Sequence, residues 1–167
     1  MKLPALILLF SISFLSFAQQ QDIEGIRVLF YKASNDRKMA KVFLDQLKRV
    51  KTVQNSTLHG YKGMAHMLQA KYAWNPYKKL DHFNTGKAIL EEAIKEDTSN
   101  IELRFLRYSV QSNAPFFLNN KSQLEADKEL IKKQWSTLQD KDLRQRISQF
   151  MLTSGDCTEA EKKLFKA

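Results

Sequence analysis

The chain has few of the residues that fix a fold by covalent bonds or tight turns. Its 167 residues include one cysteine, Cys157, with three prolines and five glycines. A single cysteine cannot form an internal disulfide, so packing must stabilise the fold. Scarce glycine and proline mean few residues that interrupt helices. Alanine, leucine, lysine, glutamate and glutamine are plentiful instead, and this composition favours an all-α protein.

The sequence also lacks the motifs of several enzyme classes. It has no glycine-rich phosphate loop, no nucleophile elbow and no H-E-x-x-H zinc motif. Acidic neighbours such as Glu91 and Glu92 point in different directions on a helix. They therefore do not form the converging pair that general acid–base catalysis needs. We expect no catalytic residue and no cofactor.

The three histidines do not have the spacing of a metal site. His59 and His66 share one helix face but lie two turns apart, about 10.5 Å along the axis. Zinc ligands must all lie about 2 Å from one ion, and His82 lies beyond a predicted loop. Packed or exposed histidines are therefore expected, and no metal.

The first residues, MKLPALILLFSISFLSFA, have the features of a cleaved signal peptide. Lys2 supplies the positive start, an apolar run follows, and Ser16-Phe17-Ala18 suits cleavage after Ala18. A transmembrane anchor is the alternative, but the apolar run is shorter than the about 20 residues that cross a bilayer. We expect a leader over 1–18, one helical domain over 19–167, and a periplasmic or secreted protein without a membrane span.

The charge balance is basic. The formal net charge is +9, and loss of Lys2 with the leader gives 9 − 1 = +8. Clustered lysine and arginine would suit nucleic acid, but export and the interspersed acidic residues argue against that partner. Solvated helix faces explain most of the charge.

Helical periodicity covers nearly the whole sequence after the leader. Asn35-Asp36, Asn55, Asn75-Pro76 and Asp140 suit helix starts, and Asp156 with Glu159 suits a capping box at the last one. We expect about eight helices in stacked antiparallel hairpins, covering 23–33, 37–53, 55–74, 75–97, 101–111, 122–138, 141–152 and 156–167, with a loop at 116–121. The segment 101–111 is apolar on more than one side and should be the most central helix.

From residue 61 onwards the sequence resembles the tetratricopeptide repeat (TPR), a family of helical hairpins. The matching first-helix positions are Tyr61, Met64, Ala65 and Leu68, and the second-helix positions are Gly86, Leu90 and Ala93. Small residues at such positions let two helix axes approach. Thr98 stands where the family has a proline, and the segment between Ala65 and Gly86 is longer than in the family.

This resemblance implies a TPR-like superhelix, with an irregular helical bundle as the alternative, and a ligand face on the first helix of each hairpin. By register, that face would be formed by His59, Lys62, His66, Gln69, Leu103, Leu106 and Val110. A groove polar at one end and apolar at the other would suit an extended peptide or a partner helix. Residues 71–118 also resemble small exported bacterial helical proteins with no assigned activity, which implies no reaction.

Three further features leave alternatives open. Arg104 and Arg107 could form one guanidinium fork for an anion, or pair with acidic neighbours such as Glu102 or Glu129. Trp74, Tyr77 and Phe83 could form a sticky rim beside Lys78 and Lys79, or pack the hairpin, which is the favoured interpretation. Cys157 could be a half-buried or exposed free thiol, or could link two chains in a disulfide dimer.

We therefore expect an exported, non-enzymatic helical module that binds a protein or peptide. One alternative is an enzyme or small-ligand carrier with a pocket between helices, which requires at least two converging titratable groups in one cavity. Another is a basic protein that binds anionic envelope polymers, whose binding would fall on raising salt.

Overall fold

The computed structural model describes residues 23–49, 55–113 and 121–166, and all its regular elements are helical. A first helical segment covers residues 23–35. The following elements are α2 (Arg37–Arg49), α3 (Ser56–Tyr72), α4 (Pro76–Glu96), α5 (Ile101–Asn113), η2 (Lys121–Gln123), α6 (Leu124–Gln134), η3 (Trp135–Thr137), α7 (Lys141–Thr153) and α8 (Glu159–Leu164). The predicted all-α fold of hairpins is confirmed. The leader 1–18, residues 50–53 of the second predicted helix and 116–120 of the predicted loop lie outside the described residues.

Side-chain caps fix most helix starts where the sequence predicts them. The carboxylate of Asp36 accepts a hydrogen bond from the backbone N–H of Met39, at 2.9 Å. The side chain of Asn55 caps α3, and that of Asn75 caps α4 just before Pro76 at the first helical position. Asp140 caps α7. Each cap satisfies backbone donors that a helix start leaves unpaired.

The predicted start of the last helix is wrong by two residues. Thr158, not Asp156, is the N-cap of α8, and its side chain forms a capping box with Glu161. Asp156 instead forms an ion pair with Lys121, at 2.9 Å. Both sites carry an acid three residues after a capping residue, so the local pattern does not distinguish them.

The α3–α4 hairpin is held by close backbone contact at two glycines. A Cβ atom at Gly86 would lie 2.5 Å from the carbonyl oxygen of Gly63, and one at Gly63 would lie 2.7 Å from that of Gly86. Only glycine fits both positions, because the two helix backbones nearly touch there. Gly86 was predicted as a close-approach position; Gly63 was not.

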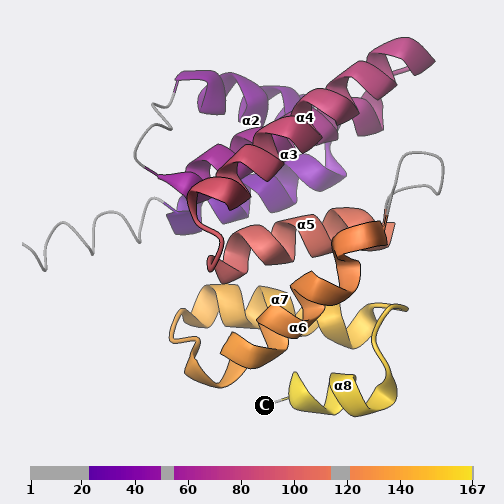
Figure 1. Cartoon of the computed structure of the whole chain (residues 1–167). Helices are drawn as coiled ribbons and strands as arrows, with labels where there is room; N and C mark the ends of the chain where they lie inside the picture. The colour runs from indigo at the N-terminus through magenta and orange to yellow at the C-terminus, as the bar shows by residue number, and fades with distance from the viewer. Residues whose placement is uncertain (1–22, 50–54, 114–120, 167) are drawn as a thin grey trace, which may run out of the picture.

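The helix α5 separates two hydrophobic cores, as its two apolar sides predict. Leu103 and Leu106 belong to the core formed with residues 23–35, α2, α3 and α4, whereas Ile101 and Tyr108 belong to the core formed with α6, α7 and the C-terminus. Figure 1 shows α5 lying between these two layers. The C-terminal core ends on Phe165, which is fully buried and packs edge-on to Trp135, with ring centroids 4.9 Å apart.

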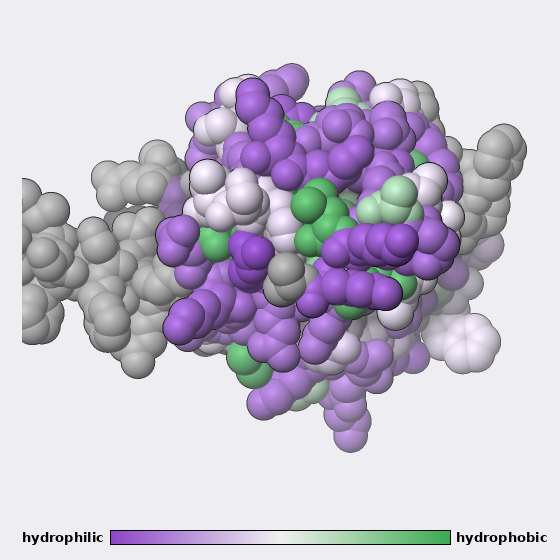
Figure 2. Space-filling view, turned by 90° about the horizontal axis from the view of Figure 1, so that it is seen from below, coloured by the Kyte–Doolittle hydropathy of each residue, from purple (hydrophilic) through white to green (hydrophobic). Residues whose placement is uncertain are grey.

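Among the residues that the structure describes, no helix combines the length and the apolar character needed to cross a bilayer. Figure 2 shows the C-terminal layer from below, where hydrophilic residues cover most of the described surface and apolar residues form small spots. The described part of this face therefore carries no extended apolar surface.

Candidate functional site

Two adjoining cavities form a groove on the side of the molecule where the two layers meet. The first, of about 510 Å³, lies between residues 23–35, α3, α5 and α7, and the second, of about 570 Å³, between residues 23–35, α3, α4 and α5. They share Phe30, Ser34, Ser109 and Asn113, so the groove is continuous. We call it the inter-hairpin groove. Its walls come mainly from residues 23–35, α3, α5 and α7, each of which is the first helix of a hairpin.

Aromatic rings line the first cavity. The rings of Phe105 and Phe150 meet edge-to-face at 5.5 Å, and those of Phe30 and Tyr61 also meet at 5.5 Å. Phe30, Phe105 and Phe150 are half-buried, and Tyr31 is 62% exposed at the rim. Half-buried rings leave apolar surface in contact with water, which a ligand can cover.

The second cavity continues the apolar surface with aliphatic and thioether side chains, among them Met64, Met67 and Val110. Methionine side chains adapt their shape to irregular apolar partners. The titratable residues that line the two cavities are Tyr31, Tyr61, Arg27, Arg146, Lys71 and Lys79. Among the described residues, the two linings contain no aspartate or glutamate, but Arg27 and Arg146 are paired with acidic residues outside the linings. Lys71 and Lys79 are therefore the charged lining residues without an ion pair to a described carboxylate.

The structure places the predicted ligand face differently. His59, Lys62, His66 and Gln69 lie on the opposite side of α3 from Tyr61, Met64 and Leu68, because successive residues turn by about 100°. The side chain of His59 contacts Glu96 at 2.9 Å, and Gln69 donates to the carbonyl of Ala40 at 2.8 Å. These four half-buried residues therefore face α4 and α2, not the inter-hairpin groove.

The apolar residues of that face have divided roles. Leu103 is fully buried against Gly60 in the first core, so it cannot line an open groove. Leu106 is almost fully buried but forms part of the groove floor, and half-buried Val110 lines the second cavity. On α5, two of the three predicted residues, Leu106 and Val110, therefore line the groove. On α3, the four predicted residues lie on the other side of the helix.

The predicted anion fork is occupied by a carboxylate of the protein. The guanidinium of Arg107 makes two bonds of 2.7 Å to Asp127, and Arg104 adds a third of 3.1 Å. Arg107 also contacts Glu91 at 2.6 Å. The alternative of an ion pair is therefore the observed one, but its acids come from α6 and α4, not from Glu102 or Glu129. Sequence spacing gave no sign of Asp127, because the contact joins two different helices.

A second buried ion cluster lies at the edge of a polar cavity of about 630 Å³. Arg27 donates to both oxygens of Glu102, at 2.7 and 2.8 Å, and to Asp140 at 2.8 Å. The hydroxyl of Tyr61 donates to Glu102 at 2.8 Å. Converging titratable groups are what an enzyme would need, and here the Glu102 carboxylate accepts three hydrogen bonds from the arginine and the tyrosine. The cluster joins four helical segments, namely residues 23–35, α3, α5 and the start of α7.

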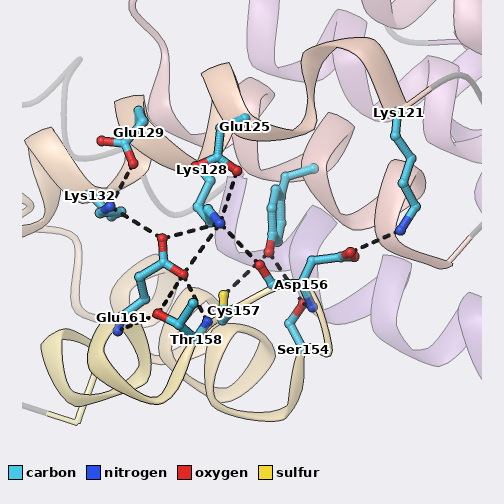
Figure 3. Close-up of polar contacts among 11 residues, drawn as sticks. Lys121, Glu125, Lys128, Glu129, Lys132, Ser154, Asp156, Cys157, Thr158 and Glu161 are labelled. Carbon is cyan, nitrogen blue, oxygen red and sulfur yellow. Dashed lines mark hydrogen bonds and ion pairs between the residues drawn. The ribbon is translucent and has the colours of Figure 1, made fainter.

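The last polar cluster joins α6 to α8 (Figure 3). The ammonium group of Lys128 lies 3.0 Å from Glu125 and 3.1 Å from Glu161, and it donates to the carbonyl of Asp156. The carboxylates of Glu125, Glu129 and Glu161 lie within 4.8 Å of one another, a spacing that a cation could bridge. Lys128 and Lys132 contact these oxygens instead, so lysine supplies the positive charge.

Cys157 is buried, with 7% of its surface exposed, and the prediction of an exposed or half-buried thiol is wrong. Its sulfur lies 3.3 Å from the hydroxyl of Tyr108, which is also 3.3 Å from that of Ser154 (Figure 3). Burial raises the pKa of Tyr108 above its ordinary value. A disulfide dimer through Cys157 would require this packing to open.

Glu161 gives the C-terminal hairpin a pH-dependent contribution to stability. Burial opposes ionisation, but the N–H of Thr158 and the ammonium of Lys128 outweigh it and lower the pKa of Glu161 to about 2. A depressed carboxylate pKa stabilises the fold above the unfolded value of 4.5, and this contribution is lost as pH falls through about 2. We expect Glu161→Gln to cost about 1 kcal/mol at pH 6 and much less at pH 2, measured by urea denaturation.

Glu159→Gln is the matched control for that measurement. Glu159 lies on the same helix, but its side chain is 83% exposed and forms an ion pair with Lys162, at 3.0 Å. We expect it to change stability little at any pH. A stability difference between wild type and Glu161→Gln that stays constant from pH 6 to pH 2 would contradict the role assigned to this carboxylate.

His66 and His82 lie beside each other on α3 and α4, with ring centroids 6.2 Å apart. The pKa of His66 is lowered, first by burial and then by the positive charge of His82, Lys48 and Lys62. Asp81 acts in the opposite direction and partly offsets these basic neighbours. The third histidine, His59, lies with Glu96 instead, so the described geometry brings two histidines together and not three.

Comparisons with protein-family models, with curated proteins and with solved structures found no match. The resemblance to the TPR family therefore rests on the sequence pattern, and the site must be judged on its own geometry. The aromatic residues Phe30 and Phe150 were not predicted as site residues. Their helical periodicity signals burial, and only their half-buried positions around one cavity distinguish them from core residues.

Proposed function

We propose that this chain is an exported, non-enzymatic interaction module that binds an apolar segment of a partner protein in the inter-hairpin groove. The observation that carries the proposal is the continuous groove, in which half-buried aromatic rings lie beside the buried side chains of Met64 and Met67, and whose described lining contains no acidic residue. A complementary ligand is an amphipathic helix or extended peptide with apolar side chains and flanking carboxylates.

Apolar area drives such binding, and the charges select the partner. Each large apolar side chain that fills a cavity contributes about 1.5–3 kcal/mol when fully buried. Lys71 and Lys79 at the second cavity would favour acidic flanking residues in the ligand. Export is part of this proposal and depends on the predicted leader.

Photo-crosslinking in the native envelope tests the proposal. A photoreactive phenylalanine analogue placed at Tyr31, on the groove rim, should give an adduct with one defined peptide segment. The same analogue at Val42, which is 50% exposed on α2, should give none above background. Mass spectrometry of the adduct then identifies the segment, and an apolar sequence with acidic neighbours is expected.

The identified peptide should bind the purified protein through the groove. Phe150→Ala removes a ring from the first cavity and should weaken binding about tenfold or more, measured by fluorescence anisotropy. Gln145→Ala, on the exposed side of the same helix α7, should leave affinity unchanged. Equal adducts at Tyr31 and Val42, or a peptide whose affinity is insensitive to Phe150→Ala, would overturn the proposal.

A further inference from the structure

The turn between α3 and α4 exposes two large aromatic side chains. Trp74 is 88% exposed and Tyr77 is 85% exposed, and Leu80 follows one turn later at 47%. The side chains of Trp74 and Tyr77 make no hydrogen bond or ring contact with any residue that the structure describes. We call residues 73–80 the α3–α4 tip. The prediction that Trp74 and Tyr77 pack the hairpin is wrong, whereas Phe83, on the same helix, is buried.

The position of the tip explains this exposure. The beginning of α4 projects at the upper right of the molecule, away from the C-terminal layer (Figure 1). A side chain there can reach a neighbouring helix only where that helix extends equally far. Two neighbouring aromatic side chains are thus exposed to water on a projecting turn, and neither belongs to the hydrophobic cores of the described residues.

Positive charge flanks the tip on both sides. Arg37, Lys38 and Lys41 line a hollow of about 370 Å³ that reaches Ala73, next to Trp74. On the other side, Lys71 and Lys79 line the second cavity of the inter-hairpin groove. Residues 36–41 and 71–81 contain six lysines and arginines against two acids, Asp36 and Asp81, and Asp36 caps α2.

We propose that the α3–α4 tip docks the protein onto an anionic lipid surface. Trp74 and Tyr77 enter the headgroup region, and the flanking lysines and arginines contact lipid phosphates. The tip adjoins the second cavity of the inter-hairpin groove, whose lining includes Lys71 and Lys79, so docking would place that end of the groove at the membrane surface.

The chemistry of the tip favours a lipid surface over a soluble polyanion. Tryptophan and tyrosine have an apolar body with one polar group, and they are enriched where hydrocarbon meets water at membranes. Basic residues close to the surface add attraction to anionic lipids, screened over about 10 Å at moderate salt. A soluble polyanion would use the charges but would not require projecting aromatic side chains.

Vesicle binding tests the proposal directly. We would purify the chain without residues 1–18, since the described fold begins at Ile23, and add vesicles of phosphatidylglycerol and phosphatidylcholine. The chain has two tryptophans, and Trp135 is buried, so a blue shift in emission reports on Trp74. Brominated lipid should quench the same emission. Binding should be absent with phosphatidylcholine alone and should fall at a few hundred millimolar salt.

Substitutions locate the binding surface. The double variant Trp74→Ser/Tyr77→Ser should reduce co-sedimentation with anionic vesicles at least about tenfold while leaving the melting temperature unchanged, because these side chains are 88% and 85% exposed. Tyr31→Ser, another exposed tyrosine but on the groove rim, should bind vesicles normally. Lys38→Gln/Lys41→Gln should weaken binding, whereas Lys133→Gln/Lys163→Gln, two exposed lysines of the C-terminal layer, should not.

Three results would overturn the proposal. The first is no binding to anionic vesicles at low salt. The second is binding that the tip substitutions leave unchanged, or that Tyr31→Ser reduces equally. The third is tight binding of soluble polyphosphate that does not depend on Trp74 and Tyr77, which would assign the basic surface to a soluble polyanion.

Discussion

Arg27→Met is expected to destabilise the protein by about 3–5 kcal/mol. Arg27 is 2% exposed, and its guanidinium bonds to Glu102, Asp140 and Asp142, at distances of 2.7 to 3.1 Å. Methionine keeps much of the volume and removes the charge. Glu102, 5% exposed, would then be a buried carboxylate with only the Tyr61 hydroxyl as its partner among these residues.

The contact matters because it joins parts of the chain that are distant in sequence. Arg27 lies in the helix 23–35, Glu102 in the first turn of α5, and Asp140 is the N-cap of α7. Acidic groups at helix N-termini are already favourable with the helix dipoles, and one arginine bonds both acids. Its loss therefore weakens the attachment of the first helix to α5 and to the start of α7.

Urea denaturation of matched variants separates the lost charge from the lost packing. Arg27→Met/Glu102→Gln should recover part of the stability, because it removes the unpaired carboxylate. Arg146→Met is the control, since Arg146 is partly exposed and bonds Asp142 within one helix, at 2.9 Å; it should cost at most about 1 kcal/mol. A cost below about 1 kcal/mol for Arg27→Met would contradict the role of this cluster in joining the layers.

Gly86→Val is expected to cost about 3 kcal/mol or more, and Gly86→Ala somewhat less. The first added carbon would lie 2.5 Å from the Gly63 carbonyl oxygen, 2.7 Å from the Met67 Cγ and 3.0 Å from the Met67 backbone nitrogen. Two of these three atoms are backbone, so no rotamer change relieves the clash. The axes of α3 and α4 must move apart, and the core between them opens.

Gly25→Ala is the matched control, and its effect should have the opposite sign. Gly25 is also a helical glycine, but a Cβ atom there meets nothing within 4 Å. Alanine should stabilise the first helix by about 0.5–1 kcal/mol. Thermal and urea unfolding of both variants test the pair. If Gly86→Ala also proved neutral or stabilising, the close backbone contact between α3 and α4 would be refuted.

The sequence predicts the helices well because their causes are local. Asn55, Asn75 and Asp140 cap their own helices within three residues, and apolar periodicity identifies the buried side of each segment. The two apolar sides of α5 even predict its position between two cores. The capping box at Thr158 was missed because Asp156 and Glu159 offer the same local pattern.

The candidate sites could not be predicted to the same degree, because they depend on which helices meet. Periodicity shows that Phe30 and Phe150 face inward, but it cannot show that they remain half-buried around one groove. Trp74 and Tyr77 are large aromatic residues, which usually pack against other side chains, and only the projection of the α3–α4 tip leaves them exposed. The choice of Asp127 as the partner of Arg107 likewise follows from the contact between α5 and α6.

By itself, the sequence determined the all-α class, the order of helices, most of their caps and the central place of α5. Hydrogen bonds and dihedral preferences over a few residues decide these features, so they can be recognised in a linear sequence. The tertiary structure alone decided the inter-hairpin groove, the two buried arginine clusters and the exposure of the α3–α4 tip. Each of these depends on the distance between helices, and that distance is fixed by packing between residues far apart in the chain, such as Gly63 against Gly86.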